Sequence, residues 1–338
     1  MRHRWLWCAL ALALALASSP LRARACELSR SDREWIAEAL EVWGGASQAL
    51  GRPLETMPWC VLYDESCAVH LNPRTRRARV PLPPNSEETD RAPLRVTFGG
   101  RPVPVRSAAY TKRFALPSGL KIGSGALAFT ALAKDGEPFF VMALPSVWKK
   151  DPRSMPDENV EEFAAGVLAH EITHTLHLRS IWSAVEDVAR RNPMPKEIDD
   201  DYLQNAVFGE DADYVAAYER EIALYRRALE EADASTAREL ARQALAASDQ
   251  RRARFFQGEN AFFTEVEPIF LNMEGVASWA AYTVVGHGGD PMAFSGRFWS
   301  QQEGLFLFLL LDRFEPRWKT RVFESPPPSP FEMLRHAL

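Results

Sequence analysis

The sequence predicts an α+β protein with a small β-containing N-terminal region followed by a mainly α-helical region. Two observations carry this prediction. Short apolar runs broken by proline and glycine fill residues 52–148, a pattern typical of strands and turns. From residue 158 onward, apolar residues instead recur at three- and four-residue spacing over long stretches, which indicates amphipathic helices. The expected organisation is residues 1–25 as an export signal, 26–125 as an N-terminal helix plus β-rich region, and 126–338 as the second region, with a helical hairpin inserted at about 196–257.

Composition narrows the class of protein. The chain has 338 residues, of which 46% are apolar and 25% charged, as in an ordinary globular protein of one or two domains. Its net charge is −5 and it has no long basic run, which argues against nucleic acid as a partner. Nothing in the sequence indicates an oligomeric state.

The N-terminus has the pattern of a secretory signal. Arg2 and Arg4 precede a short apolar run, Trp5–Ala17, and Ala23-Arg24-Ala25 resembles a cleavage site. The run is too short to span a membrane comfortably, so a signal is favoured over a membrane anchor. We expect export to the periplasm or outside the cell. Cleavage would remove four arginines and no acid, so that the net charge moves from −5 to −9, and would leave no transmembrane segment.

Three cysteines remain after the expected cleavage, and an oxidising compartment favours a disulfide among them. Cys60 and Cys67 could close a small loop, and Cys26 could instead pair with either of them. Because Cys26 directly follows the cleavage site, it could also carry a lipid anchor, although Ala23-Arg24-Ala25 is a poor lipoprotein signal. The pairing therefore stays open.

The N-terminal region is expected to begin with a helix over residues 28–50. Ser31 and Glu34 form a potential capping box, and Gly44-Gly45 should end or weaken the helix. The strands expected after it are Cys60–Tyr63, Ala78–Val80, Leu94–Phe98, Ala126–Leu132 and Phe139–Leu144, with an exposed loop at Pro81–Pro93. The last strand could pair with an extended peptide at a sheet edge, but its apolar character favours a buried core strand.

The chemistry is expected on the helix over residues 158–180, capped by Asp157. His170 and His174 are one turn apart, roughly 6 Å along the axis, so both can bind one metal ion. Glu171 points about 100° away, where it can reach a metal-bound water without being a ligand. Two packed core histidines are the alternative interpretation. His177 lies roughly 10 Å along the axis from His170, too far to share the ion easily, so we expect it to support a ligand or simply to pack.

The remaining chain is expected to be helical. A short helix, Ile181–Arg191, should precede two long ones, Asp211–Ala232 and Ser235–Phe256, whose charges are interpreted as a solvated surface. This hairpin could also form a wall or lid of a cleft. In the segment that follows the hairpin, Ala261–Val285, Glu274 stands in an otherwise apolar run. A buried carboxylate there needs a metal, an arginine or backbone donors, and we favour the metal.

The two stretches H-E-I-T-H and M-E-G-V-A-S-W together resemble the gluzincin superfamily of zinc metallopeptidases. The resemblance covers roughly residues 126–338, including a closing helix at Gln301–Phe323, and implies a zincin-like domain. It implies that His170, His174 and Glu274 bind Zn²⁺ and that Glu171 is the catalytic base. The expected activity is hydrolysis of a peptide or protein substrate.

Several assignments remain open. The gap from His174 to Glu274 is 100 residues and contains other acids, among them Glu186, Glu210 and Glu219. Relatives carry an Asp where this chain has Ser278. A transition-state donor could be Tyr282, His287 or neither.

A non-catalytic exported zinc-binding or interaction protein on the same fold is the alternative to the enzyme, and a structural module on the long helices is a second. Substrate specificity, and endo- versus exopeptidase action, are not indicated.

Overall fold

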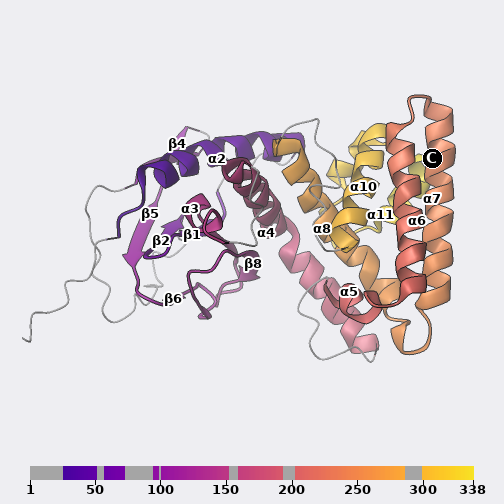
Figure 1. Ribbon diagram of the computed structural model, residues 1–338, viewed down its shortest axis with the longest axis horizontal. Coiled ribbons are helices and arrows are strands. Elements are labelled where there is room, and N and C mark those ends of the chain that lie inside the picture. Colours follow the sequence, from indigo (N-terminus) through magenta and orange to yellow (C-terminus); the bar gives the residue numbers. More distant parts are fainter. Residues whose placement is uncertain are drawn as a thin grey trace, which may run out of the picture.

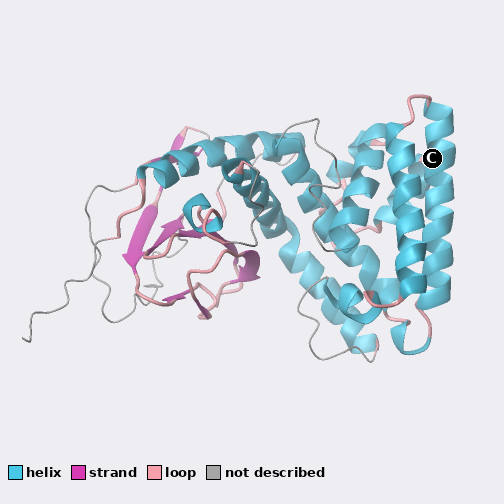
Figure 2. Ribbon diagram, viewed as in Figure 1, coloured by secondary structure: helices cyan, strands magenta, loops and turns pink. Residues whose placement is uncertain are grey.

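The computed structural model of the chain describes residues 26–51, 57–72, 94–98, 100–151, 159–192, 202–285 and 299–338. It shows a sheet-containing part and a helical part joined by one long helix, α4 (Figures 1 and 2). The architecture is α+β, as the sequence predicts. The expected signal, the strand at Ala78–Val80, the loop at Pro81–Pro93 and His287 lie outside the described residues.

The main sheet has five strands in the order β5-β2-β1-β9-β8. They are β1 (Trp59–Tyr63), β2 (Cys67–Leu71), β5 (Val105–Ala109), β8 (Ala128–Leu132) and β9 (Pro138–Ala143). β1 and β9 run parallel, and the other neighbours are antiparallel. Two short antiparallel pairs complete the strands: β3 (Val96–Phe98) with β4 (Arg101–Val103), and β6 (Phe114–Ala115) with β7 (Lys121–Ile122).

β9 is an interior strand, which confirms the expectation of a buried core strand, whereas β8 and β5 are the two edge strands of the described sheet. β1 and β9 read as continuous apolar runs because both of their faces are covered. On one face, Cys60, Leu62, Phe140 and Met142 pack with α2 (Arg30–Ala49) and α4 (Val160–Arg191). On the other face, alternate residues pack with Tyr110, Phe114, Leu116 and Ile122. Since β1 pairs with β9, the sheet joins segments on both sides of the boundary suggested at residue 125.

α2 differs from its expected ends. Ser29, not Ser31, caps the helix, because its Oγ accepts a hydrogen bond of 3.0 Å from the Asp32 amide. Glu34 pairs with Arg30 instead of completing a capping box. The helix also continues through Gly44-Gly45. A glycine costs only about 1 kcal/mol in a helix, which burial of the apolar face of α2 offsets.

A disulfide joins Cys26 to Cys67, and Cys60 is a buried free thiol. Cys60 does not pair with Cys67 because the hairpin register places Cys60 opposite Leu71, at the far end of the two strands from Cys67. A sulfur in a disulfide cannot carry a thioether-linked lipid, so the lipid anchor and this disulfide exclude one another.

α4 is one continuous helix of 32 residues, about 48 Å long. The expected break before Ile181 is absent because Ile181, Val185 and Val188 extend its buried stripe. Its N-terminal half belongs to the sheet core through Ala164, Leu168, Ala169 and Ile172, and its C-terminal half to the helical core. The histidine pair lies between the two.

The helical part contains the remaining helices and two 3₁₀ turns. These elements are α5 (Tyr202–Phe208), α6 (Ala212–Glu230), α7 (Ala234–Phe255), η1 (Gly258–Asn260), α8 (Phe263–Val285), α10 (Trp299–Phe314), η2 (Pro316–Thr320) and α11 (Pro330–Ala337), and a four-residue helix, α3 (Pro145–Trp148), follows β9 in the sheet part. No described helix is both long enough and apolar enough to cross a membrane.

The hairpin of α6 and α7 does not cover the histidine pair. It packs on α10, where Tyr214 and Tyr218 stack on Trp299, and in Figure 1 it lies beyond α10 on the side remote from α4. This packing does not support the alternative in which the hairpin forms a wall or lid of a cleft. The hairpin's apolar side chains instead pack in the core of the helical part.

The expectation that the hairpin's charges are all solvated is wrong. Arg251 of α7 is buried and pairs with three buried carboxylates, one from each of three other helices. The contacts are to Glu221 at 2.8 Å, Glu267 at 2.7 Å and Glu303 at 3.1 Å. Arg252 adds a contact of 3.0 Å to Glu267. This Arg251 cluster ties α6, α7, α8 and α10 together.

Candidate metal centre

α4 supplies the first two candidate ligands. It begins at Val160, and Asn159 caps it by accepting a hydrogen bond from the Glu162 amide, whereas Asp157 lies outside the described residues. Glu161 and Glu162 occupy the first turn, where the helix dipole favours acids. One turn of spacing places His170 and His174 on the face that meets α8, with their Nε2 atoms 2.9 Å apart.

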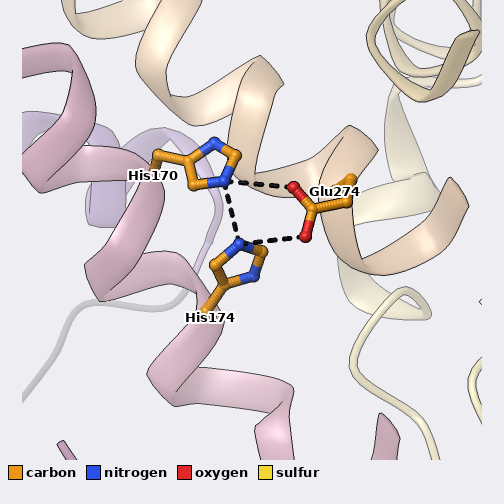
Figure 3. Close-up of side chains that lie close together, drawn as sticks. All are labelled: His170, His174 and Glu274. Carbon is orange, nitrogen blue, oxygen red and sulfur yellow. Dashed lines mark hydrogen bonds and ion pairs between the residues drawn. The ribbon is translucent and has the colours of Figure 1, made fainter. Parts of the chain in front are cut away.

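α8 brings the third candidate ligand. α4 and α8 run in opposite directions, since Gly166 lies against Ala281 and Val285 while His174 lies against Glu274. Glu274 Oε2 is 3.2 Å from His170 Nε2, and Oε1 is 3.4 Å from His174 Nε2. Figure 3 shows both rings and the carboxylate turned toward one another. Two positions 100 residues apart in the sequence thus meet at one point.

These three side chains fit a divalent metal ion. Their candidate ligand atoms all lie within 4.8 Å of one another. Atoms bonded to one tetrahedral ion at 2.0–2.1 Å are about 3.3 Å apart, close to the separations here. Glu274 Oε2 is buried and makes no hydrogen bond to a described residue beyond its ion-pair contact with His170, so a cation would satisfy its remaining bonding capacity. His170 keeps 15% of its side chain exposed, which leaves an approach from solvent.

Glu274 and His174 each stabilise the charged form of the other. Burial alone would raise the pKa of Glu274, but its ion pairs with His174 and His170 outweigh burial and hold the pKa well below its usual range. Burial likewise acts to lower the pKa of His174, and the Glu274 carboxylate outweighs it, so that this pKa is raised. The site therefore keeps an ionised carboxylate that attracts positive charge in a region with little water.

Glu171 is buried beside this pair, and a hydroxyl from the sheet holds it. Thr130 Oγ1 on β8 lies 2.8 Å from Glu171 Oε2 and 2.9 Å from the Glu171 carbonyl oxygen. Sequence reasoning missed Thr130. The available signal was a lone hydroxyl residue in an otherwise apolar strand, Ala-Phe-Thr-Ala-Leu.

His177 supports His174 and lies outside the candidate ligand group. Its Nε2 is 3.4 Å from His174 Nδ1, and its ring stacks on Phe323 with centroids 5.6 Å apart. Burial and the neighbouring His174 hold the pKa of His177 well below its usual range, so it is neutral and its nitrogen can accept. With His174 Nδ1 directed at His177, His174 Nε2 faces His170 and Glu274. Of the two roles left open for His177, support of a candidate ligand is the one that this contact favours.

The other acids considered from the sequence lie elsewhere. Glu186, Glu210 and Glu219 are exposed. Glu221 is buried in the Arg251 cluster. Among the described residues, only Glu274 joins the histidine pair in a metal-binding group.

Two further residues of α8 were singled out from the sequence. Ser278, one turn beyond Glu274, is buried and its Oγ makes no hydrogen bond. The partly buried ring of Tyr282 packs against the helical core.

A close helix crossing fixes the position of Glu274. A Cβ added to Gly275 would lie 2.7 Å from the Gly304 backbone on α10, and one added to Gly304 would lie 2.6 Å from Gly275 Cα. Real Cβ contacts are longer, so only glycine at both positions allows α8 and α10 to approach this closely. Glu274, the candidate ligand, is the residue next to this contact.

Comparison of the chain with protein-family models, curated proteins and solved structures found no match. The site must therefore be interpreted from its own residues.

Proposed function

We propose that the chain is an exported zinc metallopeptidase of the gluzincin type that hydrolyses peptide bonds. The observation that carries the proposal is the meeting of Glu274 with the H-E-x-x-H pair, His170 and His174, across 100 residues of sequence. Two histidines and one glutamate are a ligand set of catalytic zinc sites, in which a fourth position stays open.

The residues divide the chemistry between them. Zn²⁺ held by His170, His174 and Glu274 would supply Lewis-acid chemistry, lowering the pKa of water and polarising a carbonyl group. Glu171 accepts the proton of the attacking water and passes it to the leaving amine. Thr130 contacts only one of the two carboxylate oxygens of Glu171, and Oε1 makes no hydrogen bond to any described residue. Oε1 is thus the oxygen that can take the proton.

The edge strand β8 suits a peptide substrate. β8 lies beside α4, and Thr130 links the two near the site. An edge strand presents unpaired backbone groups that can pair with an extended chain. The substrate is therefore a peptide or protein segment in extended form, lying along β8 rather than along the interior strand β9.

Export is supported by the disulfide. Cys26–Cys67 would be reduced in an ordinary cytosol and persists in an oxidising compartment. We place the protein in the periplasm or outside the cell.

The test is zinc analysis and a peptide-library screen on the protein from residue 26 onward. Wild type should bind about one zinc per chain and cleave peptides. Glu171→Gln should keep the zinc and lose activity, because glutamine cannot accept the proton. Glu186→Gln, an exposed neutral replacement on the same helix, is the matched control and should remain active.

Two results would contradict the proposal. A fully active Glu171→Gln variant would remove the base from the mechanism. Zinc binding by a wild type that cleaves no peptide would favour the non-catalytic exported zinc-binding protein.

A further inference from the structure

Thr130 is placed by the sheet and aimed at the helix. β8 pairs with β9 in the register that sets Thr130 opposite Phe140. Side chains alternate along a strand, so Phe129 and Ala131 enter the core on the face away from α4, while Thr130 faces α4. The hydroxyl reaches Glu171 from a different wall of the site than the one that carries His170 and His174.

The two contacts of the hydroxyl define its position. Thr130 Oγ1 lies 2.8 Å from a carboxylate oxygen of Glu171 and 2.9 Å from the carbonyl oxygen of the same residue. A hydroxyl donates one hydrogen, so it donates to one of these oxygens at a time. Donation to an ionised carboxylate is the stronger choice. The nearby carbonyl keeps the hydroxyl over the backbone of α4, so the carboxylate is held relative to its own helix.

Nothing else described holds this carboxylate by a hydrogen bond. Glu171 is 8% exposed, and a buried glutamate side chain without such a contact would sample several rotamers. A general base must lie within hydrogen-bond distance of the proton that it removes. A side chain that fixes the carboxylate therefore controls how often the base is correctly placed.

We propose that Thr130 is a positioning residue for the base Glu171, and that β8 thereby aligns the base with the extended peptide that pairs along the same strand. The inference rests on the proposed function. Thr130 on β8 holds the base, and the substrate backbone pairs with the same strand. The distance between the base and the substrate therefore depends on β8, and not on how the sheet-containing part packs on the helical part. Thr130 itself touches no reacting atom.

The first experiment separates positioning from binding. Thr130→Val keeps the shape and removes the hydroxyl, and Thr130→Ser restores it. Thr130→Val should lower kcat by about tenfold to a hundredfold, the usual effect of misplacing a catalytic group, with KM and zinc affinity unchanged. Thr130→Ser should recover most of kcat. Thr283→Val is the control and should match wild type. It removes a hydroxyl on α8 that donates a hydrogen bond to the Trp279 carbonyl oxygen.

The second experiment needs neither metal nor substrate. Thr130→Val, Glu171→Ala and the double variant are unfolded with denaturant in the zinc-free protein. The contact predicts a non-additive shift of the unfolding midpoint, since each single variant already loses the same interaction.

The outcomes distinguish failure of the proposed function from failure of the positioning role of Thr130. Wild-type protein that binds zinc but cleaves no peptide overturns the proposed function and with it the role of Thr130. Wild-type turnover with an unchanged kcat in Thr130→Val overturns the positioning role alone. Additive midpoints overturn the Thr130–Glu171 contact itself.

Discussion

Replacing Arg251 by methionine removes the cation from the Arg251 cluster while keeping a side chain of similar length. Its guanidinium contacts Glu221, Glu267 and Glu303, and the four side chains are 0–1% exposed. Burial and the neighbouring Glu221 raise the pKa of Glu303 well above its usual range. Arg251 is therefore the cation on which Glu221 depends, while Arg252 pairs with Glu267.

The loss of Arg251 would leave the buried Glu221 without a cation, because the remaining Arg252 pairs with Glu267. Removing one member of a buried ion pair typically costs about 3–5 kcal/mol. Against a total stability of about 5–15 kcal/mol, this is a large share. For a chain of this size it corresponds to a fall in Tm of roughly 5–10 °C.

Thermal unfolding followed by circular dichroism measures this difference, with Arg254→Met as the matched control. Arg254 lies three residues further along α7 and pairs with Asp213 across the same helix pair, but both side chains are more than half exposed. Its replacement should change stability by less than about 0.5 kcal/mol. Glu303→Gln should be milder than Arg251→Met, because it leaves the guanidinium paired with Glu221 and Glu267. If Arg251→Met and Arg254→Met unfold at the same temperature, the cluster does not carry the energy assigned to it.

Three further predictions concern the metal centre, the disulfide and the sheet. Glu274→Ala should lower zinc affinity by more than roughly 100-fold in competition with a chelator, whereas Glu219→Ala should not, and the reverse result would move the ligand. Mass analysis of exported protein before and after reduction should give Cys26 as the first residue and a Cys26–Cys67 linkage, and three free thiols would refute this. Burial, with a nearby arginine, lowers the pKa of His70 to about 4, so the folded state resists its protonation. Stability should therefore fall as pH drops from about 6.5 to about 4, and His70→Gln should reduce this fall in denaturant titrations, whereas parallel curves would contradict the assignment.

Much of the site could be predicted from the sequence because its signals are local. The one-turn spacing of His170 and His174 is a property of a single helix. Glu274 stood out because an isolated acid in an apolar run needs a strong partner. Its meeting with the histidines across 100 residues depends on how α8 packs on α4, which no local pattern contains.

The buried charges show where the interpretation of the pattern failed. Glu221 lies three residues after Tyr218 and four before Tyr225, and therefore on the same helical face as these buried rings. Arg251 similarly continues the face of Ala244 and Ser248. The spacing of Glu221 and Arg251 therefore indicated that both side chains are buried. Their burial was missed because all charged residues of these polar helices were taken to be solvent-exposed.

The strand predictions were partly right. The expected strands at Cys60–Tyr63, Leu94–Phe98, Ala126–Leu132 and Phe139–Leu144 correspond to β1, β3, β8 and β9. β2 and β5 were not predicted. β2 forms a hairpin with β1, and β5 forms a strand by pairing with β2, which lies far before it in the sequence. β5 is only half-buried, and its place depends on the register that sets Val69 of β2 opposite Ser107. Strand preference depends strongly on such context. The disulfide pairing was beyond the sequence for the same reason, since it depends on where the segment before α2 lies relative to β2.

The contact of Gly275 with Gly304 has a consequence for how this protein can change during evolution. Side-chain contacts tolerate substitution because neighbouring rotamers and volumes can adjust together. A backbone contact leaves no such freedom, because any added atom would separate the two helices. The large apolar residues of the helical core can therefore drift over many generations while Glu274 stays in place. The two glycines cannot, because a larger residue at either position would separate α8 from α10 and displace Glu274 with α8.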